Sequence, residues 1–233
     1  MASVKLHVHE RGVGDKVAVL VHGGMSDHGT WHALTDVLVE RGYRVYAPDL
    51  RGHGLSERAE YSPESMADDL VENLPVGADV AIGHSLGALA LSLAVERLRP
   101  AKVVYSDPGF RMGAVPAGAF EGMRAMVANA SLESIRAMNP RWSAADVQAE
   151  LDGFRRFDQG LLARLGDFDQ DYVPASPVVP SLVQSAADSF IMTPALNEEL
   201  RGNGFEVRVV DNVGHCIHRD DFDAFLKSLD GWI

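Results

Sequence analysis

Short apolar runs alternate with segments of helical periodicity along most of this chain. A short apolar run bounded by turn residues indicates a strand, and apolar residues three or four positions apart indicate an amphipathic helix. The predicted strands cover residues 4–9, 17–21, 44–47, 80–83, 102–106, 182–184 and 205–210, and the helices between them cover residues 30–41, 63–74, 86–97 and 220–232. This alternation predicts an α/β fold, in which a mostly parallel, twisted sheet carries helices on both faces.

The alternation stops between Asp107 and Pro177, where helical segments follow one another without strands. The candidate helices in this part of the chain cover residues 131–138, 144–157 and 161–165. Functional sites of parallel sheets lie at the carboxyl ends of the strands, so an insertion at that edge is expected to cover the site as a lid. We therefore predict a core made of residues 1–110 and 176–233 and a helical lid made of residues 111–175.

Composition and charge narrow the classes of function. The chain has 233 residues, of which 46% are apolar, enough to form the core of one domain. Its formal net charge of -12 argues against nucleic acid or an anionic membrane as a partner. No apolar run is long enough to span a bilayer, and the start of the chain has no recognisable signal peptide, so we expect a cytoplasmic location. These features leave the oligomeric state open.

The segment Gly83-His84-Ser85-Leu86-Gly87 is the strongest candidate for chemistry. It follows an apolar predicted strand and opens a predicted helix. A serine on such a sharp turn is held on a strained backbone with its hydroxyl exposed, and the flanking glycines let the neighbouring elements approach closely. The pattern predicts that Ser85 is a nucleophile.

A serine nucleophile needs a general base, and the base needs an acid that orients it. His215, in the loop after the last predicted strand, is the expected base, with His218 as the alternative. Asp188, just past the preceding predicted strand, is the expected acid. Asp107, at the end of the strand before that one, is the alternative for this role.

The chain order Ser, Asp, His, with each residue on a loop after a different strand, resembles the catalytic triad of the α/β-hydrolase superfamily. Two further segments are similar to motifs of that family, namely His22-Gly23-Gly24-Met25 and the stretch from Pro48 to Ser56. The resemblance implies that the backbone N–H groups of Gly24 and Leu86 form an oxyanion hole. It also implies covalent acyl chemistry, because the haloalkane dehalogenase and epoxide hydrolase branches use an aspartate where this chain has serine.

The start of the chain departs from the pattern of the family. The family usually begins with a hairpin of two strands, whereas only one predicted strand precedes Lys16. We therefore expect the sheet to lack one edge strand. In the strand count of the family, the helical lid is inserted after the sixth strand.

The predicted lid is rich in methionine and aromatic residues and carries no catalytic motif. Met126 and Trp142 in the lid, together with Met25 beside the expected oxyanion hole, are the candidate substrate-binding residues. The favoured function is hydrolysis of a carboxylic ester or lactone of a small to medium apolar substrate. The alternatives are a carbon–carbon bond hydrolase of the β-diketone type and a hydrolase-like ligand receptor that turns over slowly. None of these functions requires a cofactor.

Several other residues have side chains that could carry chemistry. His84 precedes the nucleophile, and we expect it to pack or hydrogen-bond beside Ser85. Cys216 is the only cysteine, so it forms no internal disulfide, and we expect a buried, inert thiol. His28 and His32 are four residues apart, a spacing that suits a metal, but no carboxylate or third ligand is near them in the sequence. We therefore expect solvated histidines and no metal site.

Overall fold

A single sheet organises the molecule. The computed structural model describes residues 3–111, 118–164, 168 and 170–233. The strands are β1 (Val8–Arg11), β2 (Lys16–Val21), β3 (Tyr43–Pro48), β4 (Val80–His84), β5 (Val103–Ser106), β6 (Ser181–Ala186) and β7 (Glu206–Val210). Their order in the sheet is β1-β3-β2-β4-β5-β6-β7. Only β1 runs antiparallel to its neighbour, so the predicted mostly parallel sheet is confirmed, as is the absence of a second strand ahead of β2 within the described residues.

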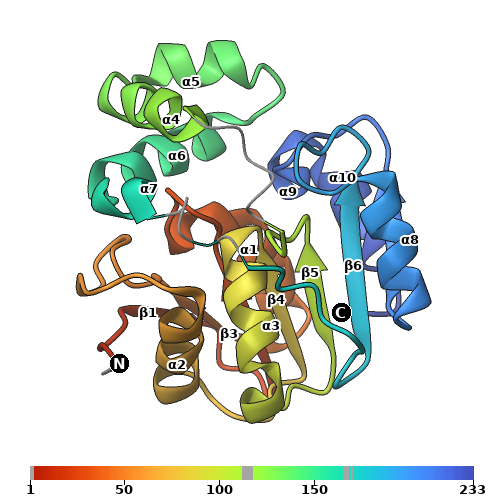
Figure 1. The fold of residues 1–233 in the computed structure, drawn as a ribbon. Helices are drawn as coiled ribbons and strands as arrows, with labels where there is room; N and C mark the ends of the chain where they lie inside the picture. Colours follow the sequence, from red (N-terminus) through yellow and green to blue (C-terminus); the bar gives the residue numbers. More distant parts are fainter. Residues whose placement is uncertain (1–2, 112–117, 165–167, 169) are drawn as a thin grey trace.

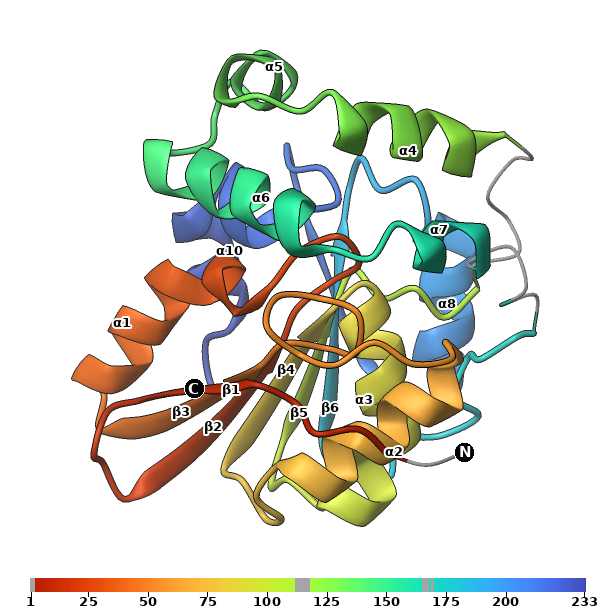
Figure 2. The ribbon, with the colours of Figure 1, turned by 90° about the vertical axis from the view of Figure 1, so that its left-hand side faces the viewer.

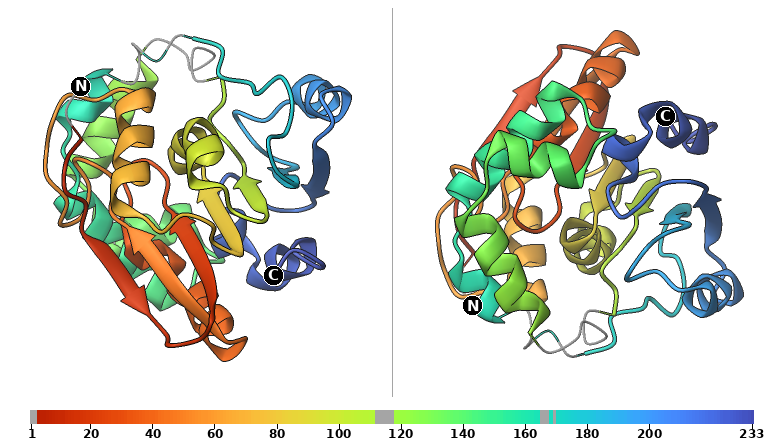
Figure 3. Two further views of the ribbon diagram at one scale, coloured as in Figure 1. Left: turned by 90° about the horizontal axis from the view of Figure 1, so that it is seen from below. Right: turned by 90° about the horizontal axis from the view of Figure 1, so that it is seen from above.

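Helices cover both faces of this sheet, as Figure 3 shows in views from below and above. One face carries α2 (Pro63–Asn73), α3 (Leu86–Leu98) and α8 (Pro194–Gly202), and the other carries α1 (His32–Glu40) and α10 (Phe222–Ser228). Successive side chains of a strand point to opposite faces, and both faces of the central strands are apolar here. The fold therefore has two cores, one on each side of the sheet.

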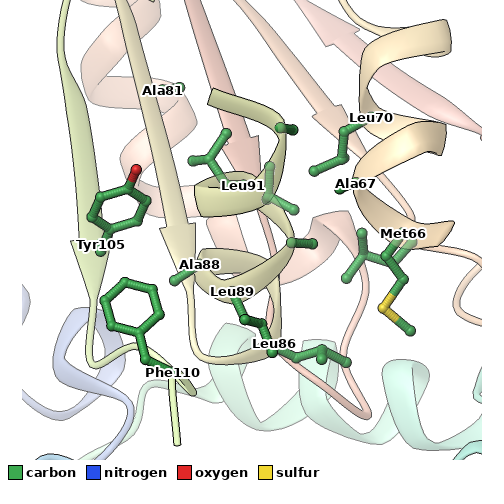
Figure 4. Close-up of a cluster of buried hydrophobic side chains, with 14 of the residues drawn as sticks. Met66, Ala67, Leu70, Ala81, Leu86, Ala88, Leu89, Leu91, Tyr105 and Phe110 are labelled. Atoms are coloured by element: carbon green, nitrogen blue, oxygen red, sulfur yellow. The ribbon is translucent and has the colours of Figure 1, made fainter. Parts of the chain in front are cut away.

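Helices α2 and α3 lie side by side on one face of the sheet, and Figure 4 shows side chains that pack between them. Leu86 and Leu89 at the start of α3 and Met66 and Leu70 of α2 are fully or almost fully buried. Ala88 faces the strand side, where small residues allow a close approach. Burial of this set fixes the direction of α3, and with it the turn that precedes the helix.

Four helices lie over the carboxyl edge of the sheet (Figures 1 and 2). Among the described residues of the insertion they are α4 (Ala119–Ala128), α5 (Leu132–Met138), α6 (Ala144–Arg156) and α7 (Gly160–Arg164), and all fall between β5 and β6 and within the predicted lid of residues 111–175. The insertion thus follows the fifth strand in chain order. Because the sheet lacks one strand of the N-terminal hairpin, this position corresponds to the expected place after the sixth strand in the count of the family.

Helix α6 packs directly on the loop that follows β2. A Cβ atom on Gly153 would lie 2.9 Å from the Cα of Ser26, so only glycine permits this approach. Arg156 at the end of α6 forms an ion pair with the buried Asp27 at 3.2 Å. These contacts hold α6 against the core.

Within the part of the chain that the structure describes, no helix has the length and apolar character needed to cross a membrane.

Candidate active site

Ser85 sits on the turn between β4 and α3, with φ of 52° and ψ of -117°. This left-handed conformation is rare for a residue with a side chain and indicates local strain. The turn is compact because Gly87 lies against β2, where a Cβ atom would be 2.2 Å from the carbonyl oxygen of His22. The glycines of the motif thus hold Ser85 at the carboxyl end of β4, as the sequence predicts.

Three side chains form a continuous hydrogen-bonded series at this edge. His215 Nε2 lies 2.9 Å from the Oγ atom of Ser85. His215 Nδ1 lies 2.7 Å from the Oδ2 atom of Asp107. The ring of His215 therefore joins a serine hydroxyl on one side to a carboxylate on the other.

The prediction that Asp188 is the acid beside His215 is wrong, since the carboxylate in contact with that ring belongs to Asp107. Asp188 lies in the turn after β6 and its side chain is exposed, whereas Asp107 follows β5 and is fully buried. Strand β5 is the immediate neighbour of β4, which carries the serine, and β6 lies one strand farther away. The order of the strands therefore favours the earlier of the two aspartates.

The carboxylate of Asp107 is held on both oxygens. Oδ1 accepts a hydrogen bond from the backbone N–H of Ala186 at 2.9 Å, and Oδ2 accepts one from the hydroxyl of Ser189 at 2.7 Å. Its own backbone N–H donates to the carbonyl of Gln184. Ser189 was not among the residues expected at the site, and no sequence motif points to it. These bonds fix the orientation of the carboxylate next to His215.

The expected oxyanion donors lie beside Ser85. Gly24 and Leu86 both line the cavity described below, and among the described residues no acceptor is paired with the backbone N–H of either one. The N–H of Leu86 also belongs to the first turn of α3, where the helix dipole favours negative charge. The backbone of Met25, the residue after Gly24, is held in place because its N–H donates to Nε2 of the buried His53 at 3.2 Å.

A cavity of about 350 Å³ opens over the serine, between the core and the lid. The three residues predicted to bind substrate, Met25, Met126 and Trp142, all lie in its wall. Its other large apolar side chains come from the lid and from the loop after β6: Met123, Ile135, Met138, Phe154, Phe190 and Ile191. Phe190 was not predicted, and it is exposed at 62% while its ring lies 4.7 Å from the ring of His215. The wall is thus mostly apolar.

One ion pair interrupts this apolar wall. The guanidinium of Arg219 pairs with the carboxylate of Glu150 on α6 and lies 4.7 Å from the centre of the Trp142 ring. Trp142 Nε1 donates to the carboxylate of Asp220, which also accepts the backbone N–H of Gly214. The lid is therefore linked to the loop that carries the histidine at the centre of the hydrogen-bonded series.

The remaining candidate side chains near the serine are His84, His218 and Cys216. Nε2–H of His84 donates to the backbone carbonyl of His215 at 2.9 Å, so His84 supports the loop of that residue. Nε2 of His218 lies 2.9 Å from the hydroxyl of Thr30 and its ring is stacked on Trp31, whereas the nitrogen paired with Ser85 belongs to His215. The expectation that Cys216 is buried is wrong, because its side chain is only partly buried and lines the cavity. Desolvation nevertheless raises the pKa of its thiol to about 12, which disfavours the reactive thiolate.

Comparison with known proteins identifies the family of this chain. The profile described as "Alpha/beta hydrolase family" matches residues 18–227. The chain is 29% identical to the putative carbamate hydrolase RutD of Variovorax paradoxus over 96% of this chain and 94% of that protein.

Two solved structures show the same fold. The N-formylmaleamic acid deformylase of Pseudomonas putida S16 has a TM-score of 0.79 at 23% identity, covering 97% of this chain and 96% of that one. A thermophilic esterase of Thermogutta terrifontis has a TM-score of 0.73 at 21% identity, covering 98% of this chain and 93% of that one. The profile match, the seven-stranded sheet and the serine turn together establish that the chain belongs to the α/β-hydrolase family.

Proposed function

We propose that this protein is a serine hydrolase that cleaves a carboxylic ester or lactone of a small to medium apolar substrate through an acyl-enzyme. The observation that carries the proposal is the series Ser85, His215 and Asp107, with separations of 2.9 and 2.7 Å between the paired atoms. A serine hydroxyl is a weak nucleophile unless a base removes its proton, and this geometry supplies the base and the acid that orients it.

In the proposed reaction, the Oγ atom of Ser85 attacks the carbonyl carbon while Nε2 of His215 takes the hydroxyl proton. The backbone N–H groups of Gly24 and Leu86 stabilise the resulting oxyanion. The tetrahedral intermediate collapses, the bond to the leaving oxygen breaks, and His215 gives its proton to that oxygen. His215 then takes a proton from a water molecule, whose oxygen attacks the acyl carbon. The bond between that carbon and Oγ breaks, and His215 returns the proton to Ser85. Asp107 keeps the ring oriented and stabilises its charged form in both steps.

The cavity supports the class of substrate. Its volume of about 350 Å³ lies near the lower end of the range for small-molecule sites. Methionine and aromatic side chains from the lid supply most of its wall, so the group bound next to the reacting carbonyl is apolar.

A second candidate is cleavage of a carbon–nitrogen bond in a carbamate or amide. It is favoured by the relative named a putative carbamate hydrolase, which this chain matches along almost its whole length. The same three side chains would serve, with His215 protonating nitrogen instead of oxygen in the leaving group.

The test is a panel of p-nitrophenyl esters, lactones, carbamates, amides and β-diketones offered to the wild-type protein and to Ser85→Ala. We expect turnover of apolar esters or lactones by the wild type, labelling of Ser85 by a fluorophosphonate probe, and neither in the variant. Turnover confined to carbamates or amides would support the second candidate, and turnover confined to β-diketones would favour carbon–carbon cleavage. Tight binding with almost no turnover of any class would contradict both hydrolase proposals and favour a ligand receptor. Activity that survives in Ser85→Ala would refute the role of the serine.

A further inference from the structure

A second group of potential ligand side chains lies outside the cavity. His7 immediately precedes β1, His28 opens the short helix η1 (His28–Trp31), and Asp49 immediately follows β3. One nitrogen of each imidazole and one oxygen of the carboxylate lie within 4.8 Å of one another. None of these three residues lines the cavity over Ser85.

The sheet and its loops hold these three segments together. The backbone N–H of Asp49 donates to the carbonyl of His7 at 2.8 Å, and Val8 pairs with Pro48 in the antiparallel ladder of β1 and β3. The backbone N–H of His28 donates to Oδ1 of Asp49 at 2.8 Å. The donor atoms are therefore brought together by main-chain contacts of the fold, and their proximity does not depend on flexible surface side chains alone.

The carboxylate is fixed, while the imidazoles keep some freedom. Asp49 is fully buried, and its Oδ2 accepts the backbone N–H of Leu55 at 2.9 Å. The side chain of His28 is 19% exposed, and His7 is also only partly buried. A ligand that reaches the carboxylate from the surface would meet both rings.

The separations fit a first-row divalent cation. Bonds of about 2.1 Å from a tetrahedral zinc to nitrogen and oxygen place neighbouring donor atoms roughly 3.4 Å apart. Nδ1 of His28 lies 2.8 Å from Oδ1 of Asp49, where a shared proton now joins the two atoms. A cation can replace that proton after a small outward movement of the ring. The largest separation in the group, at most 4.8 Å, closes when the partly exposed His7 side chain rotates inward.

The chemistry of the donors also suits such a cation. Neutral imidazole nitrogens and a carboxylate oxygen are the usual ligands of zinc, and the buried carboxylate supplies negative charge that the imidazoles lack. A fourth ring, His9, is stacked on His28 at 4.7 Å between ring centres with an angle of 17°. It shields one side of the site from solvent.

We propose that His7, His28 and Asp49 form a binding site for a divalent transition-metal cation, with zinc as the best match. Water would complete the coordination. Because the ligands come from the residue before β1 and from the loops after β2 and β3, the bound cation would link these segments and stabilise the fold. It would take no part in the reaction at Ser85, so the proposal is independent of the proposed function.

The test is titration of the chelator-treated, full-length protein with zinc chloride, followed by calorimetry and thermal unfolding. Cobalt(II) serves as a second probe, because its visible absorption reports tetrahedral nitrogen and oxygen ligands. We expect one zinc ion per chain and a rise in Tm on saturation. His7→Ala and His28→Gln should each weaken zinc binding by a factor of ten or more, and the double variant should abolish the rise in Tm.

A matched control comes from a second histidine paired with a carboxylate. Nε2 of His32 lies 2.9 Å from Asp146, but this pair is not part of any group of three ligand side chains found among the described residues. His32→Ala should therefore bind zinc as the wild type does. The Tm of each variant without metal reports whether it folds. Absence of saturable zinc binding in the wild type would overturn the proposal, and so would binding that the double variant retains or that His32→Ala removes.

Discussion

Nε2 of the buried His53 accepts the backbone N–H of Met25 at 3.2 Å, and Met25 occupies a left-handed conformation with φ of 64°. Nδ1–H of the same ring donates to the carbonyl of Arg51. Burial lowers the pKa of His53 to about 3, so the ring is neutral and keeps its acceptor at neutral pH. One imidazole therefore fixes the strained residue that follows Gly24, an expected oxyanion donor.

The first prediction follows from this contact. His53→Phe keeps a ring but removes the acceptor, so the N–H of Met25 loses its partner and the peptide of Gly24 shifts. Losing an oxyanion donor outright costs about 10²–10³ in kcat, and a displaced donor should cost about 10 to 100-fold. The measurement is kcat and KM for the best ester of the panel, with KM expected to change little.

His53→Gln is the matched variant, since its amide oxygen can accept the same hydrogen bond, and it should recover part of the lost kcat. Equal kcat values in the wild type and in a folded His53→Phe would show that this ring does not position the oxyanion loop.

The second prediction separates the two aspartates. Asp107→Asn should lower kcat by about 10⁴-fold, the loss that the corresponding amide causes in serine proteases, because an amide no longer holds the imidazole in its productive form. Asp188→Asn should stay within about twofold of the wild type, since its side chain is exposed. Steady-state kinetics of both variants, together with their Tm values, provides the comparison. The reverse ranking would contradict the proposed role of Asp107.

The third prediction concerns the lid side of the cavity. Met126→Ala enlarges the cavity. The ratio of kcat/KM for bulky acyl chains to kcat/KM for short ones should therefore change by about 10- to 200-fold, equivalent to about 1–3 kcal/mol. The reactivity of Ser85 toward a fluorophosphonate should stay unchanged. Leu132→Ala is the control, because Leu132 is 46% exposed on α5 and is not part of the wall. An identical loss on every substrate would instead indicate that the lid has unfolded.

The fourth prediction is a dependence of stability on pH. Burial lowers the pKa of four fully buried histidines below the ordinary value of 6.5: His22, His53, His84 and His218. The pKa of the partly buried His9 is lowered as well. As pH falls through 6.5, the unfolded chain therefore takes up more protons at these side chains than the folded chain does. Each group lowers the free energy of unfolding by at most about 1.4 kcal/mol per pH unit below 6.5, and contributes nothing at higher pH.

His28 has the opposite effect on the free energy of unfolding, because its hydrogen bond to Asp49 raises its pKa. The four buried groups outnumber it, so the free energy of unfolding should fall steeply between pH 6.5 and 5. Urea unfolding at several pH values measures this slope, and His53→Phe should reduce it by up to about 1.4 kcal/mol per pH unit. A free energy of unfolding that is constant from pH 7 to 5 would contradict the neutral state of these rings.

The sequence alone determined the fold class and the place of the serine. Strand and helix periodicity depend only on neighbouring residues, so they can be predicted from the sequence. The turn at Ser85 is also local, because it depends on Gly83 and Gly87, each two positions from the serine. His215 was likewise predictable, since it follows the last strand in a short loop.

Only the tertiary structure decided which side chains meet. Asp107 and Asp188 both follow parallel strands, and the choice between them depends on the sheet order, which places β5 next to β4 and buries Asp107 under backbone and hydroxyl donors. The same holds for His7, His28 and Asp49, which are at least 21 positions apart from one another and become neighbours through the pairing of β1 with β3 and the fold of the loop after β2. Hydrophobic periodicity shows which face of one segment is buried. A contact between distant segments depends instead on how the whole chain packs.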